Sequence, residues 1–486
     1  MNERKLLPLL LTLAIASAVR AQDARPVAFT DARLVPISGP VIERGTLVVR
    51  NGKIEALGAD VVVPPGARIV DARGKTILPG LVSAWSRAGM QPPPRASDPQ
   101  PMGGRRGRPG PIEAPPTSGP TGNRAATKVV DGLYGKQPVF GDLLRAGVTS
   151  LALTPSGGGF PGLGAVLRPD GKTVEQLTRD DDAFVQVVMV RDSGTKKLLK
   201  ETFEKAQKVV DDRKKPPEKP AAPPAADAKA SEGKPAEKPA AEPPKGNEPP
   251  KPPEPKPEPK PEPKPEPKPE PKPDEKKDNP PSGQAPQGAP PTRAAQAPKD
   301  PNLEVLADLL EGKRRAIVQI DNGADFLHWQ AVVPDTVAFP RAIAVQRHDP
   351  TSGTIDVVME QVKAWKCPVL LPAEMTTVPR SRHLIHPSKQ LHDAGVEIAF
   401  ALGDNAQAVR GVFFRLMELV RYGLPADVAL RAVTLVPAKI LGIDKQAGSL
   451  EVGKDADLLV FADDPLSPAG ELETVWIGGV EVKKEP

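Results

Sequence analysis

The sequence predicts an α/β protein in which a parallel sheet is accompanied by a small β-rich domain built from both chain ends. Two observations support this fold class. The middle of the chain alternates amphipathic helical segments with short apolar runs, which is the pattern of βα units that bury a parallel sheet. Short strand-like segments separated by turn residues occur near both ends, and such segments can complete one sheet. The periodicity does not choose between a doubly wound sheet and a closed barrel.

The β-rich ends carry hairpin signals. Asn51-Gly52 lies between two alternating runs, which is a strong signal for a type I′ turn. Gly478-Gly479 takes the same place in TVWIGGVEVKK near the C-terminus. These signals assign residues 22–78 and 446–486 to one small β-sheet domain, and residues 79–212 and 300–445 to a helix-and-strand domain.

The helix-and-strand domain contains repeated units of a helix, a glycine and a strand. VFGDLLRAGVTSLALTP predicts a helix that ends before Gly147, followed by an apolar strand. NLEVLADLLEGKRRAIVQID repeats the arrangement around Gly312. Connections of this kind join parallel strands.

Two stretches interrupt this pattern. Residues 213–299 are predicted to be a disordered insertion rich in Pro, Lys, Glu and Ala, and its centre repeats Pro-Glu-Pro-Lys from Pro253 to Pro273. Alternate prolines remove backbone donors, while Lys and Glu bury no apolar surface. The segment is either a stiff spacer arm or an expanded surface loop. Residues 92–123, rich in Pro, Gly and Arg, are predicted to be a second irregular loop.

Composition excludes several classes of protein. The 486 residues include 63 prolines and 3% aromatic residues, which agrees with a chain that is packed only in part. The net charge is +5, from 66 basic and 61 acidic residues without an unbalanced basic block, so no nucleic acid partner is expected. Cys367 is the single cysteine, so no intrachain disulfide can form. Its place at the start of an apolar strand predicts a packed thiol rather than a nucleophile.

The N-terminus predicts export. Arg4 and the lysine after it precede an apolar run over Leu6–Val19, and Ala21 closes a V-R-A cleavage pattern, so residues 1–21 read as a signal peptide. The alternative is a buried N-terminal helix. The run is too short to span a bilayer, and no other segment is apolar enough to be transmembrane. We therefore expect an exported protein, periplasmic or secreted.

Two motifs carry a family resemblance. VDARGKTILPGLVSAW near the front and AVTLVPAKILGIDKQAGSLEVGKDADLLVFADDPL near the back together resemble the amidohydrolase superfamily, specifically its imidazolonepropionase-like members. In that family a strand ends Pro-Gly-Leu-Ile-Asp-Ala-His-x-His, and the tail reads Thr-x-x-Pro-Ala-x-x-Leu-Gly, Gly-Ser-x-x-x-Gly-Lys-x-Ala-Asp. The matching tail residues here are Thr434, Pro437, Ala438, Leu441, Gly442, Gly448, Ser449, Gly453, Lys454, Ala456 and Asp457. The resemblance covers nearly the whole mature chain except the two irregular stretches. It implies a (β/α)8 TIM-type barrel with a composite β-sandwich, and a hydrolase of carbon–nitrogen bonds other than peptide bonds.

The resemblance also implies a site at the carboxyl ends of the barrel strands. There the family holds one or two divalent metals such as zinc with a first-strand His-x-His, later histidines and a last-strand aspartate, and metal-bound water supplies hydroxide. Trp85 and Arg87 occupy the two first-strand histidine positions here, and Gln319 stands at a middle-strand position. His348 follows another strand, and Asp404 takes the aspartate position.

These residues predict a degenerate metal site. A zinc site needs three or four protein ligands, so by this count no bound metal is expected at the family position, and Asp404 remains the candidate catalytic residue. Trp85, Arg87, Gln319 and His348 are expected to line the pocket. An Arg87–Asp404 pair would replace the positive charge of the metal by a guanidinium. The alternative is that these residues are repacked core.

Other motifs allow a functional and a structural interpretation. His383, His386 and His392 could form a new metal site, or they are polar histidines of a loop and a helix surface. The glycine-rich segment Ser156–Gly164 could cradle an anion through backbone donors, or it is a strand-exit loop.

Three functions follow from these patterns. The first is a carbon–nitrogen hydrolase with a metal-poor site in which Asp404 acts as the base. The second is a catalytically inactive relative that binds a small molecule, a peptide or a paralogous subunit. The third is a structural periplasmic protein whose proline-rich insertion matters more than its barrel. The expected partners are a small-molecule substrate or ligand and, by resemblance, a second copy of the chain or an active paralogue.

Overall fold

The computed structural model describes residues 25–90, 121–190, 192–215, 299–333, 339–345, 355–377 and 381–483. The chain divides into two units, residues 1–215 with 298–486 and residues 216–297, and only the first unit contains described residues. The predicted signal peptide, almost all of the two irregular stretches and the candidate site residue His348 lie outside the described residues.

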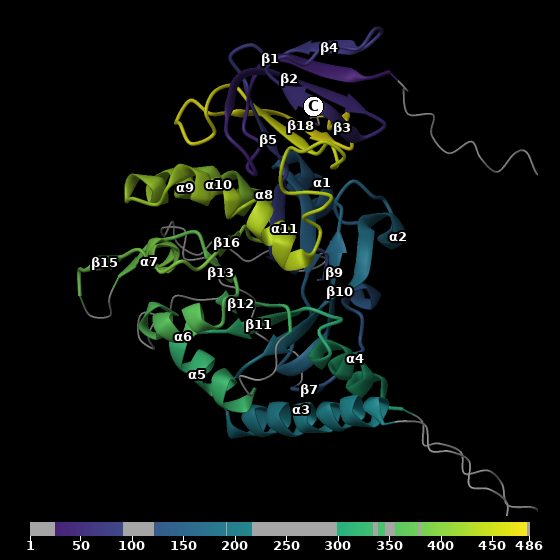
Figure 1. Ribbon diagram of the computed structural model, residues 1–486, viewed down its shortest axis with the longest axis vertical. Helices are drawn as coiled ribbons and strands as arrows, with labels where there is room; N and C mark the ends of the chain where they lie inside the picture. The colour runs from purple at the N-terminus through teal and green to yellow at the C-terminus, as the bar shows by residue number, and fades with distance from the viewer. Residues whose placement is uncertain are drawn as a thin grey trace, which may run out of the picture. The chain divides into compact units, whose positions relative to one another are not determined.

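Strands from both ends of the chain form one mixed sheet, drawn in purple and yellow in Figure 1. The strand order is β19-β18-β17-β5-β1-β2-β3, with β4 beside β1, and the antiparallel pair β5–β17 joins the two ends. Phe29, Leu47 and Trp476 lie in the core that both ends share. The strands are β1 (Val27–Leu34), β2 (Ile42–Arg50), β3 (Lys53–Gly58), β4 (Arg68–Asp71), β5 (Thr76–Pro79), β17 (Leu458–Phe461), β18 (Leu472–Ile477) and β19 (Val480–Glu481).

Both predicted hairpin turns are confirmed. Asn51 and Gly52 have φ values of 51° and 76°, and Arg50 pairs with Lys53 across the turn. Gly478 and Gly479 have φ values of 55° and 74° between β18 and β19. Positive φ at both central residues defines the type I′ turn and explains the Asn-Gly and Gly-Gly sequences.

The second sheet is a nearly closed barrel. Its strand order is β16-β13-β12-β11-β10-β9-β8-β6, and its first and last strands, β6 and β16, contact each other. A two-residue strand, β7 (Gly122–Asn123), pairs with β9, and β14 (Thr376–Thr377) forms a separate pair with β15 (Leu384–Ile385). The barrel strands are β6 (Leu81–Ser86), β8 (Val148–Leu153), β9 (Gly159–Leu167), β10 (Thr178–Val188), β11 (Ala316–Ile320), β12 (Arg341–Val345), β13 (Val369–Pro372) and β16 (Ile398–Ala401).

The barrel sheet differs from eight parallel strands at β9. This strand runs antiparallel to both β8 and β10, whereas the pairs β6–β8, β10–β11, β11–β12, β12–β13 and β13–β16 are parallel. The segment between β8 and β9, Thr154–Gly158, is too short for the crossover of a dozen or more residues that a parallel connection requires. A hairpin therefore replaces one βα unit.

The helices follow the predicted helix–glycine–strand pattern, which is confirmed at two glycines. Gly147 after α1 has φ 102°, and Gly312 after α4 has φ 73°. No helix in the described ranges is long and apolar enough to cross a membrane. The helices are α1 (Pro138–Arg145), α2 (Val174–Leu177), α3 (Ser193–Lys214), α4 (Pro301–Leu310), α5 (Gly323–Val332), α6 (Met359–Ala364), α7 (Pro387–Asp393), α8 (Ala406–Arg410), α9 (Val412–Arg421), α10 (Ala426–Arg431) and α11 (Leu435–Leu441), with 3-10 turns η1 (Val129–Gly132) and η2 (Ile355–Val358).

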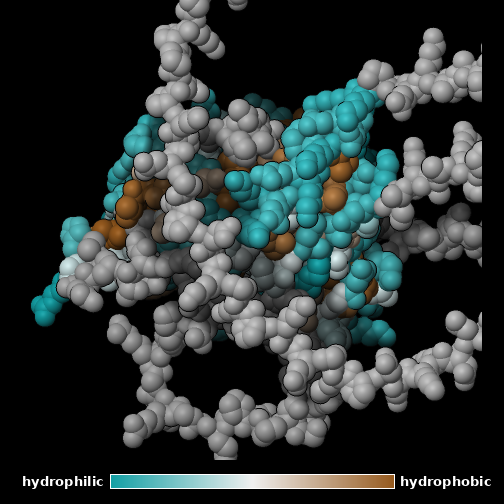
Figure 2. All heavy atoms as spheres, turned by 90° about the horizontal axis from the view of Figure 1, so that it is seen from below, coloured by the Kyte–Doolittle hydropathy of each residue, from teal (hydrophilic) through white to brown (hydrophobic). Residues whose placement is uncertain are grey.

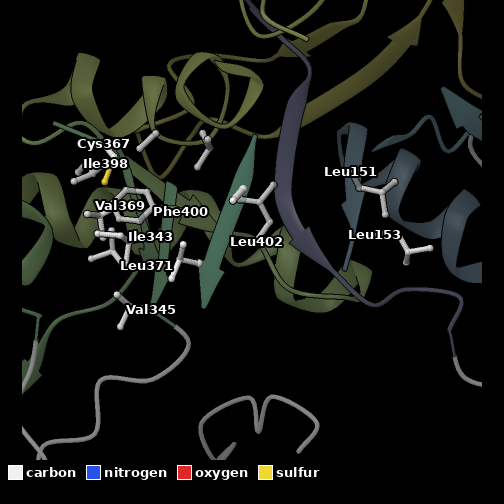
Figure 3. Close-up of a cluster of buried hydrophobic side chains, with 14 of the residues drawn as sticks. Leu151, Leu153, Ile343, Val345, Cys367, Val369, Leu371, Ile398, Phe400 and Leu402 are labelled. Carbon is white, nitrogen blue, oxygen red and sulfur yellow. The ribbon is translucent and has the colours of Figure 1, made fainter. Parts of the chain in front are cut away.

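Alternate side chains of the barrel strands face two different cores. One set, which includes Ile343, Leu371 and Phe400, packs with helix residues on the outside of the sheet (Figure 3). The other set faces the inside of the barrel and includes Val82, Ala152, Ile317, Ala344 and Ala399. These side chains pack with Val436 and Ala438 of α11. The interior is thus lined largely by small side chains.

Cys367 belongs to the outer core (Figure 3), where it is 6% exposed. Burial raises the pKa of its thiol to about 12. Because the thiolate is the nucleophilic form, the prediction of a packed cysteine is confirmed.

Candidate functional site

The first barrel strand is positioned by a close approach at Gly80. β5 ends at Pro79 in the composite sheet, and β6 begins at Leu81 in the barrel. A Cβ at Gly80 would lie 2.1 Å from Oγ1 of Thr149, so glycine is required for β6 to lie this close to its neighbour. From this point β6 brings Trp85 to the carboxyl end of the sheet.

Arg87 and Asp404 meet where β6 and β16 close the barrel. The main-chain N–H of Arg87 donates a hydrogen bond to Oδ1 of Asp404, with a length of 2.9 Å. Both residues are half-buried. Desolvation lowers the pKa of the Arg87 guanidinium, and the nearby negative charge of Asp404 opposes this shift. The structure therefore brings these two predicted site residues together through a main-chain bond, where the sequence hypothesis assumed a side-chain pair.

Two other predicted site residues also lie on the inner side of the sheet. Trp85 packs against the inner core. Gln319 is 2% exposed on β11 and shares the strand face of Ile317, which belongs to that core. The structure does not place His348, which lies outside the described residues.

Among the described residues, the predicted site side chains do not by themselves make a zinc centre. The indole of Trp85 and the guanidinium of Arg87 offer no lone pair to a cation, whereas the carboxylate of Asp404 and the amide oxygen of Gln319 do. The charge of Arg87 beside that carboxylate would also oppose a bound cation. Among the described residues, no three or more His, Cys, Asp and Glu side chains are grouped so that they could hold a metal ion. A divalent metal would need ligands from outside these residues.

His386 has a structural role that the sequence interpretation missed. It is 8% exposed and begins α7, where its Nδ1 accepts a hydrogen bond from the main-chain N–H of Lys389 at 3.1 Å. Its Nε2 lies 3.0 Å from the carbonyl oxygen of Leu419, so the proton is on Nε2. The expectation of polar loop and helix-surface histidines is therefore wrong for His386, because helix capping keeps it buried. Pro387 is the first residue of α7, a position that proline favours.

The glycine-rich segment does not form a free anion cradle. Its first residues belong to the hairpin loop, where the carbonyl oxygen of Ser156 accepts a hydrogen bond from Nη2 of Arg124 at 3.3 Å. The remainder, Gly159–Gly164, lies in the buried strand β9 with its backbone paired to neighbouring strands. The strand-exit interpretation holds for the loop residues alone.

Two residues of interest escaped the sequence interpretation. Glu374 follows β13, the strand next to β16, and desolvation raises the pKa of its carboxyl group although Arg415 opposes the shift. Gln186 is fully buried on β10. A carboxylate two residues after a buried strand and a lone amide inside AFVQVVMV were signals that could have identified them.

Similarity to known proteins agrees with this fold. The family model described as Amidohydrolase family matches residues 348–482, so the chain carries an amidohydrolase family domain there. Amidohydrolase tasK of Hapsidospora irregularis is 32% identical over 98 residues, which are 20% of this chain and 10% of that protein. The 5-methylthioadenosine/S-adenosylhomocysteine deaminase of Moorella thermoacetica (strain ATCC 39073 / JCM 9320) is 36% identical over 63 residues, which are 12% of this chain and 15% of that protein. The chain thus spans 10% and 15% of the curated relatives that it matches.

A solved structure extends the likeness to nearly the whole chain. The crystal structure of an amidohydrolase from Thermotoga maritima MSB8 matches with a TM-score of 0.62 and 20% sequence identity, and the match covers 94% of this chain and 100% of that one. At this identity the likeness shows the fold alone. The chain therefore has a mixed α/β fold with a nearly closed barrel sheet, similar to the fold of the Thermotoga maritima amidohydrolase.

Proposed function

We propose that this protein is a hydrolase of the amidohydrolase type that acts on a carbon–nitrogen bond, other than a peptide bond, of a small molecule. The observation that carries the proposal is the junction of Asp404 with Arg87, a carboxylate and a guanidinium at the carboxyl end of the barrel sheet. The amidohydrolase family domain over residues 348–482 and the names of the two relatives support the reaction class. We further assign the fold to a (β/α)8 TIM-type barrel of the imidazolonepropionase-like branch, with a hairpin in place of one unit and a composite β-sandwich.

The proposed chemistry uses this chain's own residues. The Asp404 carboxylate accepts a proton from water as the water oxygen attacks the carbonyl carbon of the substrate. The Arg87 guanidinium stabilises the negative charge that develops on the carbonyl oxygen. Collapse of the tetrahedral intermediate breaks the carbon–nitrogen bond, and the proton held by Asp404 passes to the leaving nitrogen. The family's metal ligands are largely replaced in this proposal.

The test combines metal content with turnover. The purified mature protein is incubated with zinc, manganese or iron salts, dialysed, assayed for bound metal and then assayed against lactams and hydantoins. Hydrolysis by metal-poor protein, lost in Asp404→Asn, supports the proposal. Near-stoichiometric metal that is lost in Asp404→Ala would show that Asp404 is a ligand and overturn the metal-poor mechanism. Absence of turnover in every condition would overturn the hydrolase assignment.

A second candidate function is a catalytically inactive barrel that binds a small molecule. Trp85 favours it, because the indole packs against the inner core where the family resemblance implies a histidine ligand. Saturable binding without turnover would select this candidate.

We also propose that the protein is exported. Mass spectrometry of protein recovered outside the cytoplasm tests this, because cleavage of the predicted signal peptide would leave Gln22 as the first residue.

A further inference from the structure

The edge of the composite sheet at β19 is a surface with specific pairing properties. On the face drawn in Figure 2, hydrophobic areas are small and separated by hydrophilic residues. At the sheet edge, by contrast, β19 is the last strand in the described part of the chain, and it pairs with β18 alone. A last strand presents main-chain donors and acceptors that can pair with another strand.

The register of β19 determines which main-chain groups point outward. The main-chain N–H of Val482 donates to the carbonyl oxygen of Val475 on β18, with a length of 2.8 Å. Successive residues of an antiparallel strand direct their main-chain groups to opposite sides. The N–H and C=O groups of Glu481 and Lys483 therefore point away from β18. Within the described ranges, no main-chain hydrogen bond joins either residue to a further strand.

The two residues with outward main-chain groups carry opposite charges. Glu481 and Lys483 are both exposed. Nη2 of Arg68 lies 3.6 Å from the Glu481 carboxylate, and this contact involves side chains alone. Val480 and Val482 alternate with the charged residues, so this segment has one charged face and one apolar face.

A groove of about 680 Å³ lies beside this edge. Its lining includes Val480 and Val482, together with Leu472 at the start of β18 and Arg145 at the end of α1. Val480 is 51% exposed. An open strand edge beside a groove for alternate side chains is the arrangement that binds an added strand.

The same segment of a second copy fits this edge in one register. If the Val482 residues of two antiparallel copies meet on a twofold axis, Glu481 of each copy lies opposite Lys483 of the other. The main-chain bonds then join the residues that point outward, and opposite charges lie directly across the junction.

Other registers lose one of these two properties. A shift by one residue sets Glu481 opposite Val482, whose main-chain groups already face β18. A shift by two residues keeps the bonding pattern but sets Glu481 opposite Glu481, or Lys483 opposite Lys483, and like charges directly opposite are destabilising. In the favoured register the two Val482 side chains form a pair without main-chain bonds, the kind in which side chains approach most closely.

We propose that β19 is the docking surface for a second copy of this chain, which forms a twofold dimer through an antiparallel β19–β19 junction. The occupant is a second copy because the register that bonds the outward groups is also the register that pairs opposite charges. The composite sheet then continues from one copy into the other, and the interface closes on itself. This inference does not depend on the proposed hydrolase function.

Charge reversal tests the junction. Sedimentation equilibrium of the purified wild type over a series of concentrations should show dimers. Glu481→Lys sets lysine opposite lysine at both pairs, and Lys483→Glu sets glutamate opposite glutamate, so each should weaken dimerisation about tenfold or more. A mixture of the two variants has glutamate opposite lysine at both pairs and should dimerise like the wild type. Glu204→Lys and Lys208→Glu make the same charge changes on exposed positions of α3 and should change nothing.

The outcomes decide both the surface and its register. Dimers that are lost in each variant alone and recovered in the mixture support the junction. A wild type that is monomeric up to its solubility limit overturns it, and so do dimers that persist unchanged in both variants. Loss in each variant without recovery in the mixture overturns the register. If one variant does not fold, the double variant Glu481→Lys/Lys483→Glu decides, because it restores opposite charges and should dimerise like the wild type.

Discussion

Asp404 combines two roles that a single substitution would confuse. Its carboxylate accepts the main-chain N–H of Arg87 at 2.9 Å, and it lies beside the Arg87 guanidinium. Asp404→Ala removes the acceptor and leaves a half-buried N–H without that bond, so the free energy of unfolding should fall by about 1–3 kcal/mol. Asp404→Asn keeps an oxygen acceptor and should lose less than about 1 kcal/mol. Urea denaturation of the two variants measures the difference.

The same pair of variants separates structure from catalysis. If Asp404 is the base, both variants lose turnover although the asparagine variant stays folded. Full turnover in a stable Asp404→Asn variant would restrict Asp404 to holding β6 against β16.

The buried carboxyl group of Asp457 predicts how the stability of the folded protein depends on pH. Its Oδ1 accepts hydrogen bonds from Arg168 at 3.2 Å and from the main-chain N–H of Gly478 at 2.8 Å, with the carboxylate of Asp455 in the same cluster. Burial nevertheless dominates and raises the pKa of Asp457 to about 6 from 3.8. Because the folded state holds the proton more tightly than the unfolded state, this contribution to stability is present below about pH 4 and is lost as the pH rises through about 6.

Asp457→Asn should remove this pH dependence. Between pH 4 and 7 the wild type should lose on the order of 3 kcal/mol relative to the variant, as measured by urea denaturation at a series of pH values. The control is Asp463→Asn, which changes an exposed carboxylate of the same region. Parallel curves for wild type and Asp457→Asn would contradict a raised pKa.

At the residue scale, the sequence predicted the features that depend on a few neighbouring residues. It identified Asn51-Gly52 and Cys367, because turn chemistry and an apolar neighbourhood are local properties. It could not assign His386 or Gln186, because capping partners and strand register depend on contacts between distant segments. The roles of Trp85, Arg87, Gln319, His348 and Asp404 stay predictions.

At the element scale, the junction between the two sheets depends on Gly80. A Cβ there would lie 2.1 Å from Oγ1 and 2.4 Å from Cγ2 of Thr149, so Gly80→Ala forces β6 away from β8. Overpacking of this kind costs about 1–3 kcal/mol, and thermal denaturation should show a lower midpoint. Gly39→Ala is the matched control, because no atom lies within 4 Å of a Cβ at Gly39. Equal midpoints for the two variants would show that the strands adjust without cost.

At the element scale, residue patterns predicted the order of helices and strands and did not predict the direction of β9. Helix, glycine and strand follow one another as predicted around Gly147 and Gly312, because helix ends and apolar runs depend on residues that are close in sequence. The residues of β9 do not predict its direction, because an apolar run has the same pattern in parallel and antiparallel strands. The short Thr154–Gly158 connection was the signal that indicated a hairpin.

At the scale of the whole molecule, α3 and α4 pack together at the two ends of the insertion. Arg213 on α3 pairs with Glu304, and it lies 2.9 Å from both Asp308 and Glu311 on and just after α4. Hydrogen bonds to Glu304 and Asp308 raise the pKa of the Arg213 guanidinium above its already high value. These contacts join described residues on either side of the insertion, so we expect the barrel to fold without residues 216–298.

Excision tests whether the insertion contributes folded structure. Replacing residues 216–298 by a Gly/Ser linker of about ten residues shortens the loop by about three halvings, which lowers the closure cost by roughly 2 kcal/mol. The shortened protein should therefore be at least as stable as the full chain in urea denaturation. Arg213→Ala in the shortened protein should lower the stability, because three carboxylates then lose their shared cation. A shortened protein that is several kcal/mol less stable would show that the insertion packs on the barrel, which would contradict the predicted disorder.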